Sequence, residues 1–319
     1  MLLLLIFFNG SLYADTHIQS GYDVLIIVPE KRSPYNIIIN RIKREFTLNK
    51  KHEKFRVLSL GSGKLGANNQ LLSGNKLVIT LGAKSLDYYL KSGIKSPFIS
   101  SFITESAFSS ITRRYKKTTS FRNKLVGAIS LEQPIYRIMS LLKSIQKNTK
   151  SVGVVLGPKT TNKQAILYNQ LKKKLGGVLN VAKISYQDNP VKKLRAIFKK
   201  SQYVIVIPDK ASFNRNLAHW VITLSYKYKV PVISYSRKYS EAGALISIYS
   251  EPEQIALQTA QMAQTYLRFS NYPTLLKPHP PSYFQLAINQ SVRQAFGLEL
   301  PRKKELIKRL YELEAAEKN

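Results

Sequence analysis

Residues Gln202–Tyr249 read QYVIVIPDKASFNRNLAHWVITLSYKYKVPVISYSRKYSEAGALISIY and predict a strand, a helix and a second strand. The apolar run Tyr203–Ile207 ends at a Pro-Asp pair, and the shorter run Val230–Ile233 ends in Ser-Tyr-Ser. Between the two runs, apolar residues recur at helical spacing. Continuous Val/Ile runs joined through a helix are typical of a parallel sheet that is buried on both faces. The stretch therefore indicates an α/β fold.

Polar side chains follow both strands of this unit. Asp209 and Lys210 come after the first strand, and Tyr235 and Ser236 come after the second. Ligands of open α/β sheets bind beyond the carboxyl ends of the strands, so we expect these residues to line a ligand site. The Asp209 carboxylate suits a ligand ammonium group, although aspartate is also favoured at helix N-termini. An aromatic ring such as that of Tyr235 suits stacking on an apolar ligand.

The alternation of strands and helices occurs twice along the chain. Strands are expected at 22–28, 54–60, 76–81, 97–103 and 124–129, and again at 151–156, 179–185, 203–207 and 230–233. Alternating strands and helices favour a parallel sheet covered by helices. Since 319 residues exceed a typical single domain, we predict two doubly wound parallel-sheet lobes.

Two later segments carry a resemblance to a known family. They are AGALISIYSEPEQIALQTAQMAQTYL at 242–267 and YFQLAINQSVRQAFGLELPRKKELIKRLYEL at 283–313. The second contains a closing motif with Ile288, Asn289, Ala295, Gly297, Leu298 and Pro301. With the strand-Pro-Asp and PVISYS segments, these resemble the ABC-transporter substrate-binding protein family, whose better-known members bind aromatic amino acids such as tryptophan. The likeness spans roughly 21–313 and is strongest from 151 onward.

The resemblance implies a periplasmic binding protein type I-like fold, with two lobes that close around a small solute by hinge motion. It implies that the helix at 252–267 packs back on the first lobe. Lobe 1 would then comprise 20–130 plus 251–274, and lobe 2 would comprise 131–250 plus 282–319, joined by a multi-strand hinge. The implied partners are an ABC permease and ATPase, the implied ligand class includes amino acids, and a monomer is expected.

Further ligand contacts are implied by the same resemblance. The turn Gly82–Ser85 stands where the family has Gly-Thr-x-Ala, and a helix N-terminus there favours an anion such as a carboxylate, although a plain cap uses the same physics. The pair Glu105-Ser106 replaces the family's Asp-Pro, so this loop has changed. The resulting candidates outside the 202–249 stretch are Lys84, Ser85, Ser101, Thr104, Thr160 and Thr161.

The net charge of +32 arises from 50 basic and 18 acidic residues. Such a charge attracts nucleic acids and anionic surfaces. The basic residues are spread over predicted helix faces and loops, which favours a solvated surface over a specific nucleic-acid interface. Two alternatives to a transport role stay open. They are an exported sensor or accessory binding module, and a basic protein that binds nucleic acid or an anionic surface.

The N-terminus predicts export. Residues 2–8 read LLLLIFF, a run far shorter than the roughly 20 apolar residues needed to span a bilayer. The run fits the apolar core of a secretory signal that is cleaved after Ala14, so we expect a periplasmic protein. The sequence contains no cysteine, which excludes a lipoprotein anchor, disulfides and thiolate chemistry.

No motif indicates catalysis. The histidines are not spaced as metal ligands, and no nucleophile elbow or paired-carboxylate motif occurs. The G-x-G-x-x-G match at 61–66 follows a strand but does not open a helix as a dinucleotide site requires. We therefore expect a binding protein that is not an enzyme, with no cofactor and no metal.

Overall fold

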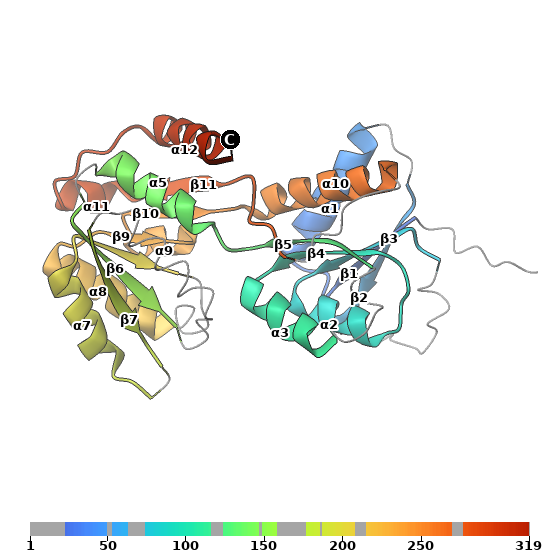
Figure 1. The fold of residues 1–319 in the computed structure, drawn as a ribbon, viewed down its shortest axis with the longest axis horizontal. Helices are drawn as coiled ribbons and strands as arrows, with labels where there is room; N and C mark the ends of the chain where they lie inside the picture. Colours follow the sequence, from blue (N-terminus) through green and yellow to red (C-terminus); the bar gives the residue numbers. More distant parts are fainter. Residues whose placement is uncertain are drawn as a thin grey trace, which may run out of the picture.

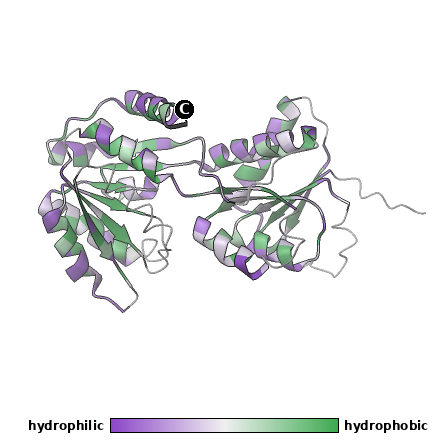
Figure 2. Cartoon of the chain, viewed as in Figure 1, coloured by the Kyte–Doolittle hydropathy of each residue, from purple (hydrophilic) through white to green (hydrophobic). Residues whose placement is uncertain are grey.

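The computed structural model describes residues 23–49, 53–62, 74–115, 124–146, 149–157, 177–185, 187–207, 215–269 and 277–318. These residues form two α/β lobes, each built on its own sheet (Figure 1). Figure 2 shows apolar strands inside each lobe and helices that carry both apolar and polar residues around them. The predicted fold class is confirmed.

Lobe 1 contains a five-stranded parallel sheet in the order β2-β1-β3-β4-β5. Its strands are β1 (Val24–Val28), β2 (Phe55–Ser59), β3 (Leu77–Leu81), β4 (Phe98–Ile103) and β5 (Leu125–Ser130). A short 3-10 turn, η1 (Leu60–Ser62), follows β2. Strands β1, β3 and β5 are buried along their whole length, as their continuous apolar runs predict.

Helices cover both faces of this sheet. One face packs against α1 (Tyr35–Leu48) and α10 (Pro252–Arg268), which places alanines of α10 against isoleucines of α1. The other face packs against α2 (Ala83–Lys91) and α3 (Glu105–Tyr115). The small side chains of α10 let it lie close to α1, so a segment that interrupts lobe 2 in the sequence completes lobe 1.

Lobe 2 contains a six-stranded sheet in the order β11-β10-β9-β8-β6-β7, in which β11 alone is antiparallel to its neighbour. The strands are β6 (Ser151–Leu156), β7 (Val178–Lys183), β8 (Tyr203–Val206), β9 (Val232–Ser234), β10 (Ile246–Tyr249) and β11 (Gln285–Ile288). The described part of the 202–249 stretch thus forms three neighbouring parallel strands, so the carboxyl ends of these strands lie at the same end of the sheet.

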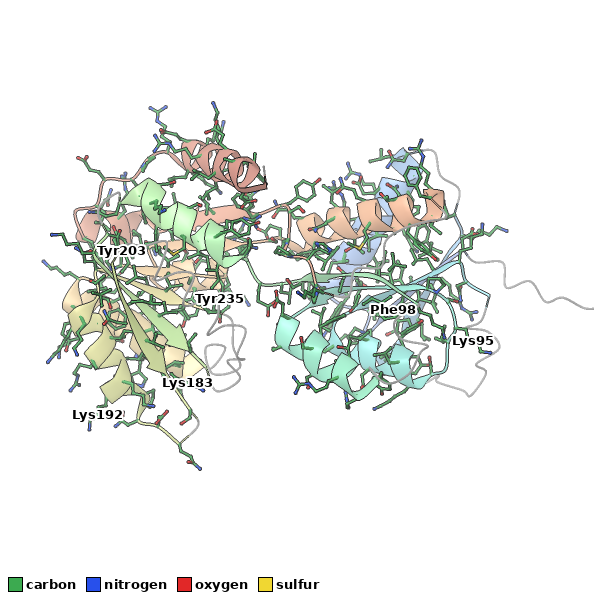
Figure 3. The ribbon with its side chains drawn as sticks, viewed as in Figure 1. Lys95, Phe98, Lys183, Lys192, Tyr203 and Tyr235 are labelled. Carbon is green, nitrogen blue, oxygen red and sulfur yellow. The ribbon has the colours of Figure 1, made fainter. Side chains whose placement is uncertain are left out.

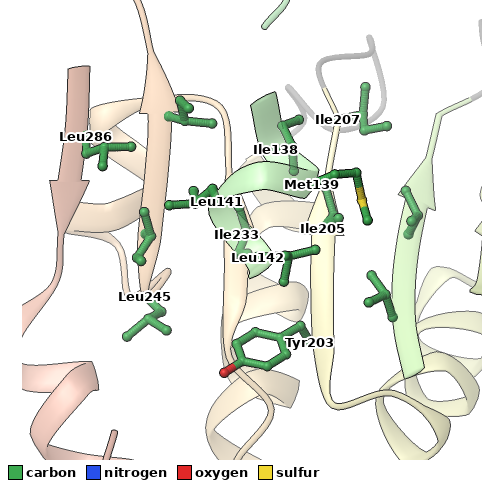
Figure 4. Close-up of a cluster of buried hydrophobic side chains, with 14 of the residues drawn as sticks. Ile138, Met139, Leu141, Leu142, Tyr203, Ile205, Ile207, Ile233, Leu245 and Leu286 are labelled. Carbon is green, nitrogen blue, oxygen red and sulfur yellow. The ribbon is translucent and has the colours of Figure 1, made fainter. Parts of the chain in front are cut away.

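The helices of lobe 2 also form two layers. On one face lie α5 (Ile135–Ile145), α11 (Gln290–Ala295) and α12 (Lys303–Lys318), and Figure 4 shows part of the apolar cluster beneath them. On the other face lie α7 (Pro190–Lys200), α8 (Arg215–Tyr228) and α9 (Arg237–Glu241). Within the described ranges, no helix has the length and apolar character needed to cross a membrane.

The segments that connect the lobes are hydrogen bonded to one another. Gln133, between β5 and α5, donates from Nε2 to Ser250 Oγ at 2.9 Å. Ser250 lies between β10 and α10, and its hydroxyl donates to the carbonyl of Tyr283 at 2.6 Å. His279 extends the last connection along β5, because its N–H donates to Ala128 and its carbonyl accepts from Ser130 N. Three crossings thus form one joined hinge.

Gly153 in β6 allows α7 to approach the sheet closely. A Cβ at this position would lie 2.7 Å from Ser201 Oγ and 2.9 Å from Ile197 Cγ1. The substitution Gly153→Ala is therefore expected to lower the free energy of unfolding by about 1–2 kcal/mol through overpacking. Urea denaturation followed by the fluorescence of Trp220, the single tryptophan, measures the effect in lobe 2. An unchanged midpoint would contradict this packing.

Candidate ligand-binding site

The first candidate turn follows β3 in lobe 1. Gly82 has φ +83, a conformation that favours glycine, and it begins α2 without a side-chain cap. The following Lys84 is exposed, whereas Ser85 is fully buried. The Ser85 hydroxyl has no hydrogen-bond partner among the described residues. This turn therefore presents uncapped N–H groups at a helix N-terminus, with one positive side chain beside them.

The second turn follows β4. Ser101 is buried, and its hydroxyl lies 2.6 Å from Thr259 Oγ1 of α10, so it joins the sheet to the returning helix. Thr104 caps α3, because its Oγ1 accepts a hydrogen bond from Ala107 N at 3.2 Å. Of these two candidates, Thr104 is the one that lies beyond the carboxyl end of its strand.

Glu132 follows β5 and lies at the same carboxyl end of the sheet as Thr104. Both of its carboxylate oxygens accept from the N–H of Glu105, at 3.0 Å each. Burial raises the pKa of Glu132 from its ordinary 4.5 to about 7, although the hydrogen bond from Glu105 N acts in the opposite direction. Lobe 1 thus places a carboxyl group, close to its ionisation point at neutral pH, beside the first hinge segment.

Glu132 is absent from the sequence-based candidates. The signal that points to it is the rule that identified Tyr235 and Ser236, a polar residue just after a buried strand. Glu132 lies two residues beyond 130, where the sequence-based division ends lobe 1, and no candidate was expected there.

The third set of residues follows β9 in lobe 2. Tyr235 is half-buried, its ring packs on that of Tyr239 at 5.6 Å, and Figure 3 shows it on the side of lobe 2 nearest to lobe 1. Ser236 caps α9 by accepting a weak hydrogen bond from Tyr239 N at 3.4 Å. Arg237 donates to Tyr249 Oη at 2.9 Å and pairs with Glu251 at 2.6 Å. Tyr235 is therefore the residue of this turn that offers an aromatic surface.

The remaining candidates are not placed. Thr160, Thr161, Asp209 and Lys210 lie outside the described residues. Within the described part of the chain, no cluster of His, Asp or Glu has the arrangement of a metal site. The described strand ends provide hydroxyl, aromatic and carboxyl groups, which suit recognition of a small polar molecule.

Two α/β lobes with polar strand ends and a joined hinge define a two-lobed solute-binding protein. The family model described as ABC transporter substrate binding protein matches residues 62–308. The chain therefore belongs to the ABC transporter substrate-binding protein family, which agrees with the resemblance found in the sequence. Proteins of this family bind substrates and are not enzymes, and they typically act outside the cytoplasm together with transporter subunits.

Solved structures agree on the fold. A ligand-free, open structure of a substrate-binding protein with adhesive properties from Clostridium difficile matches with a TM-score of 0.67 and 14% identity, over 87% of this chain and 95% of that chain. An ABC domain in complex with L-Trp from Streptococcus pneumonia matches with a TM-score of 0.54 and 16% identity, over 90% and 98%. A periplasmic ribose ABC transporter from Conexibacter woesei matches with a TM-score of 0.53 and 10% identity, over 88% and 96%. No curated protein matches the chain.

Proposed function

We propose that this protein binds an amino acid or a similar small solute between its lobes and presents it to the permease and ATPase of an ABC importer. The observation that carries the proposal is the arrangement of polar strand ends on two α/β lobes that are joined by three hydrogen-bonded segments. A ligand that contacts both lobes favours the closed state, because its binding free energy depends on the lobe arrangement.

The described groups suit the two charged ends of an amino acid. Glu132 offers a carboxylate to an ammonium group, and the uncapped N-terminus of α2 beside Lys84 favours a carboxylate. Tyr235 offers an aromatic face from lobe 2. The similar Streptococcus protein was solved with L-Trp, so L-tryptophan is the first ligand to test.

The proposal includes export. Cleavage of the apolar N-terminal run after Ala14 would release a monomeric periplasmic protein without a lipid anchor. Sequencing the N-terminus of the mature protein tests this step, and a retained Met1 would contradict it.

Isothermal titration calorimetry at pH 8 tests solute binding. The amino acids are titrated one by one, starting with L-tryptophan. We expect one of them to bind saturably at one equivalent. The variant Glu132→Gln is expected to bind it about tenfold or more weakly, because a hydrogen bond to a charged group contributes about 1.5–3 kcal/mol. The matched control is Glu253→Gln, which removes an exposed carboxylate from α10.

The two parts of the proposal fail in different ways. Absence of saturable binding with all amino acids, nucleosides and sugars would contradict a solute-binding role. Tight binding that is unchanged in Glu132→Gln would retain the role but remove Glu132 from the site.

A further inference from the structure

A cavity lies in lobe 2, along the edge strand β11. Its volume is about 680 Å³, within the range of small-molecule sites. It is lined by Leu286–Ile288 of β11, by residues of α9 and Tyr249, and by parts of the segment 289–303. This segment includes Asn289 and Pro301 of the closing motif that resembles the family. The motif is not part of the interlobe site, and these two residues line the lobe 2 cavity instead.

The lining of this cavity is strongly cationic. It contains Arg237, Arg293, Arg302 and Lys303, with Glu241 as the one carboxylate among the described residues that line it. Arg237 is already engaged, since its guanidinium pairs with Glu251 and donates to Tyr249. The lining therefore carries a net positive charge, because Glu241 cannot neutralise all of its basic residues.

The other three cations lack a partner in the part of the chain that the structure describes. Among the described residues, the side chains of Arg293, Arg302 and Lys303 form no hydrogen bond or ion pair. Arg293 is half-buried, and its Nε is a buried donor without an acceptor. A buried donor without a partner is unfavourable, so an acceptor within reach of this Nε gains more than it would on the open surface.

The polar frame around the cavity is fixed by its own hydrogen bonds. Asn289 donates from Nδ2 to the carbonyl of Ser240 at 2.6 Å and accepts from Val292 N at 3.0 Å. The Ser240 hydroxyl donates to the carbonyl of Ala287 in β11 at 3.0 Å. Since this carbonyl of the edge strand is already bonded, the site suits a small molecule better than an added peptide strand.

We propose that this cavity binds a small polyanion that carries two or more carboxylate or phosphate groups. Guanidinium groups form bidentate hydrogen bonds with such oxygens, and an ammonium group adds a third point of positive charge. The site is built from lobe 2 alone, so its occupancy does not require the interlobe ligand.

Calorimetry on the full chain at about 0.15 M salt tests the proposal, with pyrophosphate and citrate as probes. The site variant combines Arg293→Gln, Arg302→Gln and Lys303→Gln. The control variant combines Lys192→Gln, Arg195→Gln and Lys199→Gln, which removes the same charge from the exposed face of α7, where Figure 3 labels Lys192. Because the chain carries a net charge of +32, this charge-matched control is essential.

The wild type and the control are expected to bind one equivalent of at least one probe, and the site variant at least about tenfold more weakly. Preference for pyrophosphate indicates phosphate recognition, and preference for citrate indicates carboxylate recognition. Absence of saturable binding to the wild type, or an equal loss in the control, would overturn the proposal. If the triple variant fails to fold, the exposed change Arg302→Gln alone is expected to weaken binding about threefold, and unchanged binding would count against the site.

Discussion

Replacing Arg137 with alanine is expected to lower the free energy of unfolding of lobe 2 by about 3–5 kcal/mol. Arg137 on α5 is only 1% exposed, and its partner Glu314 on α12 is 6% exposed. The guanidinium donates to both carboxylate oxygens, from Nε and Nη2. Removing the arginine leaves a buried carboxylate with neither water nor a counter-charge, which explains the large cost.

Arg137 also holds the hinge. Its Nη1 donates to Gln133 Oε1 at 2.6 Å and to the carbonyl of Pro281 at 2.9 Å, and its guanidinium lies 4.3 Å from the centre of the Phe284 ring. Gln133 in turn donates to Ser250 in the second connection between the lobes. Loss of this one side chain therefore removes contacts to α12 and to two hinge segments together.

Two further variants separate the charge from the packing. The double variant Arg137→Met with Glu314→Leu is expected to recover most of the loss, because apolar residues of similar volume often replace a buried ion pair without cost. The variant Arg309→Ala breaks the exposed pair with Glu305 and is expected to cost less than about 0.5 kcal/mol. Urea denaturation monitored by Trp220 fluorescence measures all three. A cost for Arg137→Ala as small as that for Arg309→Ala would contradict this account.

The Arg137 pair also shows where sequence reasoning ends. Apolar residues at 135, 138, 139, 142 and 145 have the spacing of an amphipathic helix, and α5 is such a helix, yet this spacing alone assigns its arginine to the solvated face. The carboxylate that satisfies it lies 177 positions away on a helix whose docking no local pattern reveals. The strands are easier to predict than this ion pair. A continuous apolar run such as Tyr203–Ile207 indicates a strand that is buried on both faces, and so predicts the sheet directly.

The positions of the strand-end turns could be predicted from the sequence, but the partners of their polar atoms could not. The strand-end rule indicated the turn of Ser236, and the family resemblance indicated that of Thr104. The structure shows that both hydroxyls cap the helices that follow. Ser101 is bonded to Thr259 on a helix that the chain reaches 158 positions later. Which polar atoms remain available to a ligand depends on such contacts, and they are set by tertiary packing.

Replacing Glu132 with glutamine is expected to stabilise the protein by about 2–3 kcal/mol at pH 8 and to leave its stability nearly unchanged at pH 4. Burial raises the pKa of Glu132 to about 7 in the folded state, above the ordinary value of 4.5. At pH 4 the carboxyl is largely protonated in both states. Between about pH 4.5 and 7, the Glu132 carboxyl is ionised in the unfolded chain but still largely protonated in the folded protein. The wild type therefore loses stability as the pH rises through this range.

Denaturation followed by circular dichroism at pH 4, 6 and 8 measures this difference, with the exposed Glu253→Gln as the control. The control is expected to show no such dependence on pH. A Glu132→Gln variant that is less stable than the wild type at pH 8 would show that the hydrogen bonds from Glu105 N outweigh the cost of burial. The stability of this variant also bears on ligand binding. A ligand ammonium group beside Glu132 would offset the free-energy cost of burying the ionised carboxylate. Glutamine would then raise the stability of the free protein while it weakens binding, as expected for a residue that is kept for its ligand.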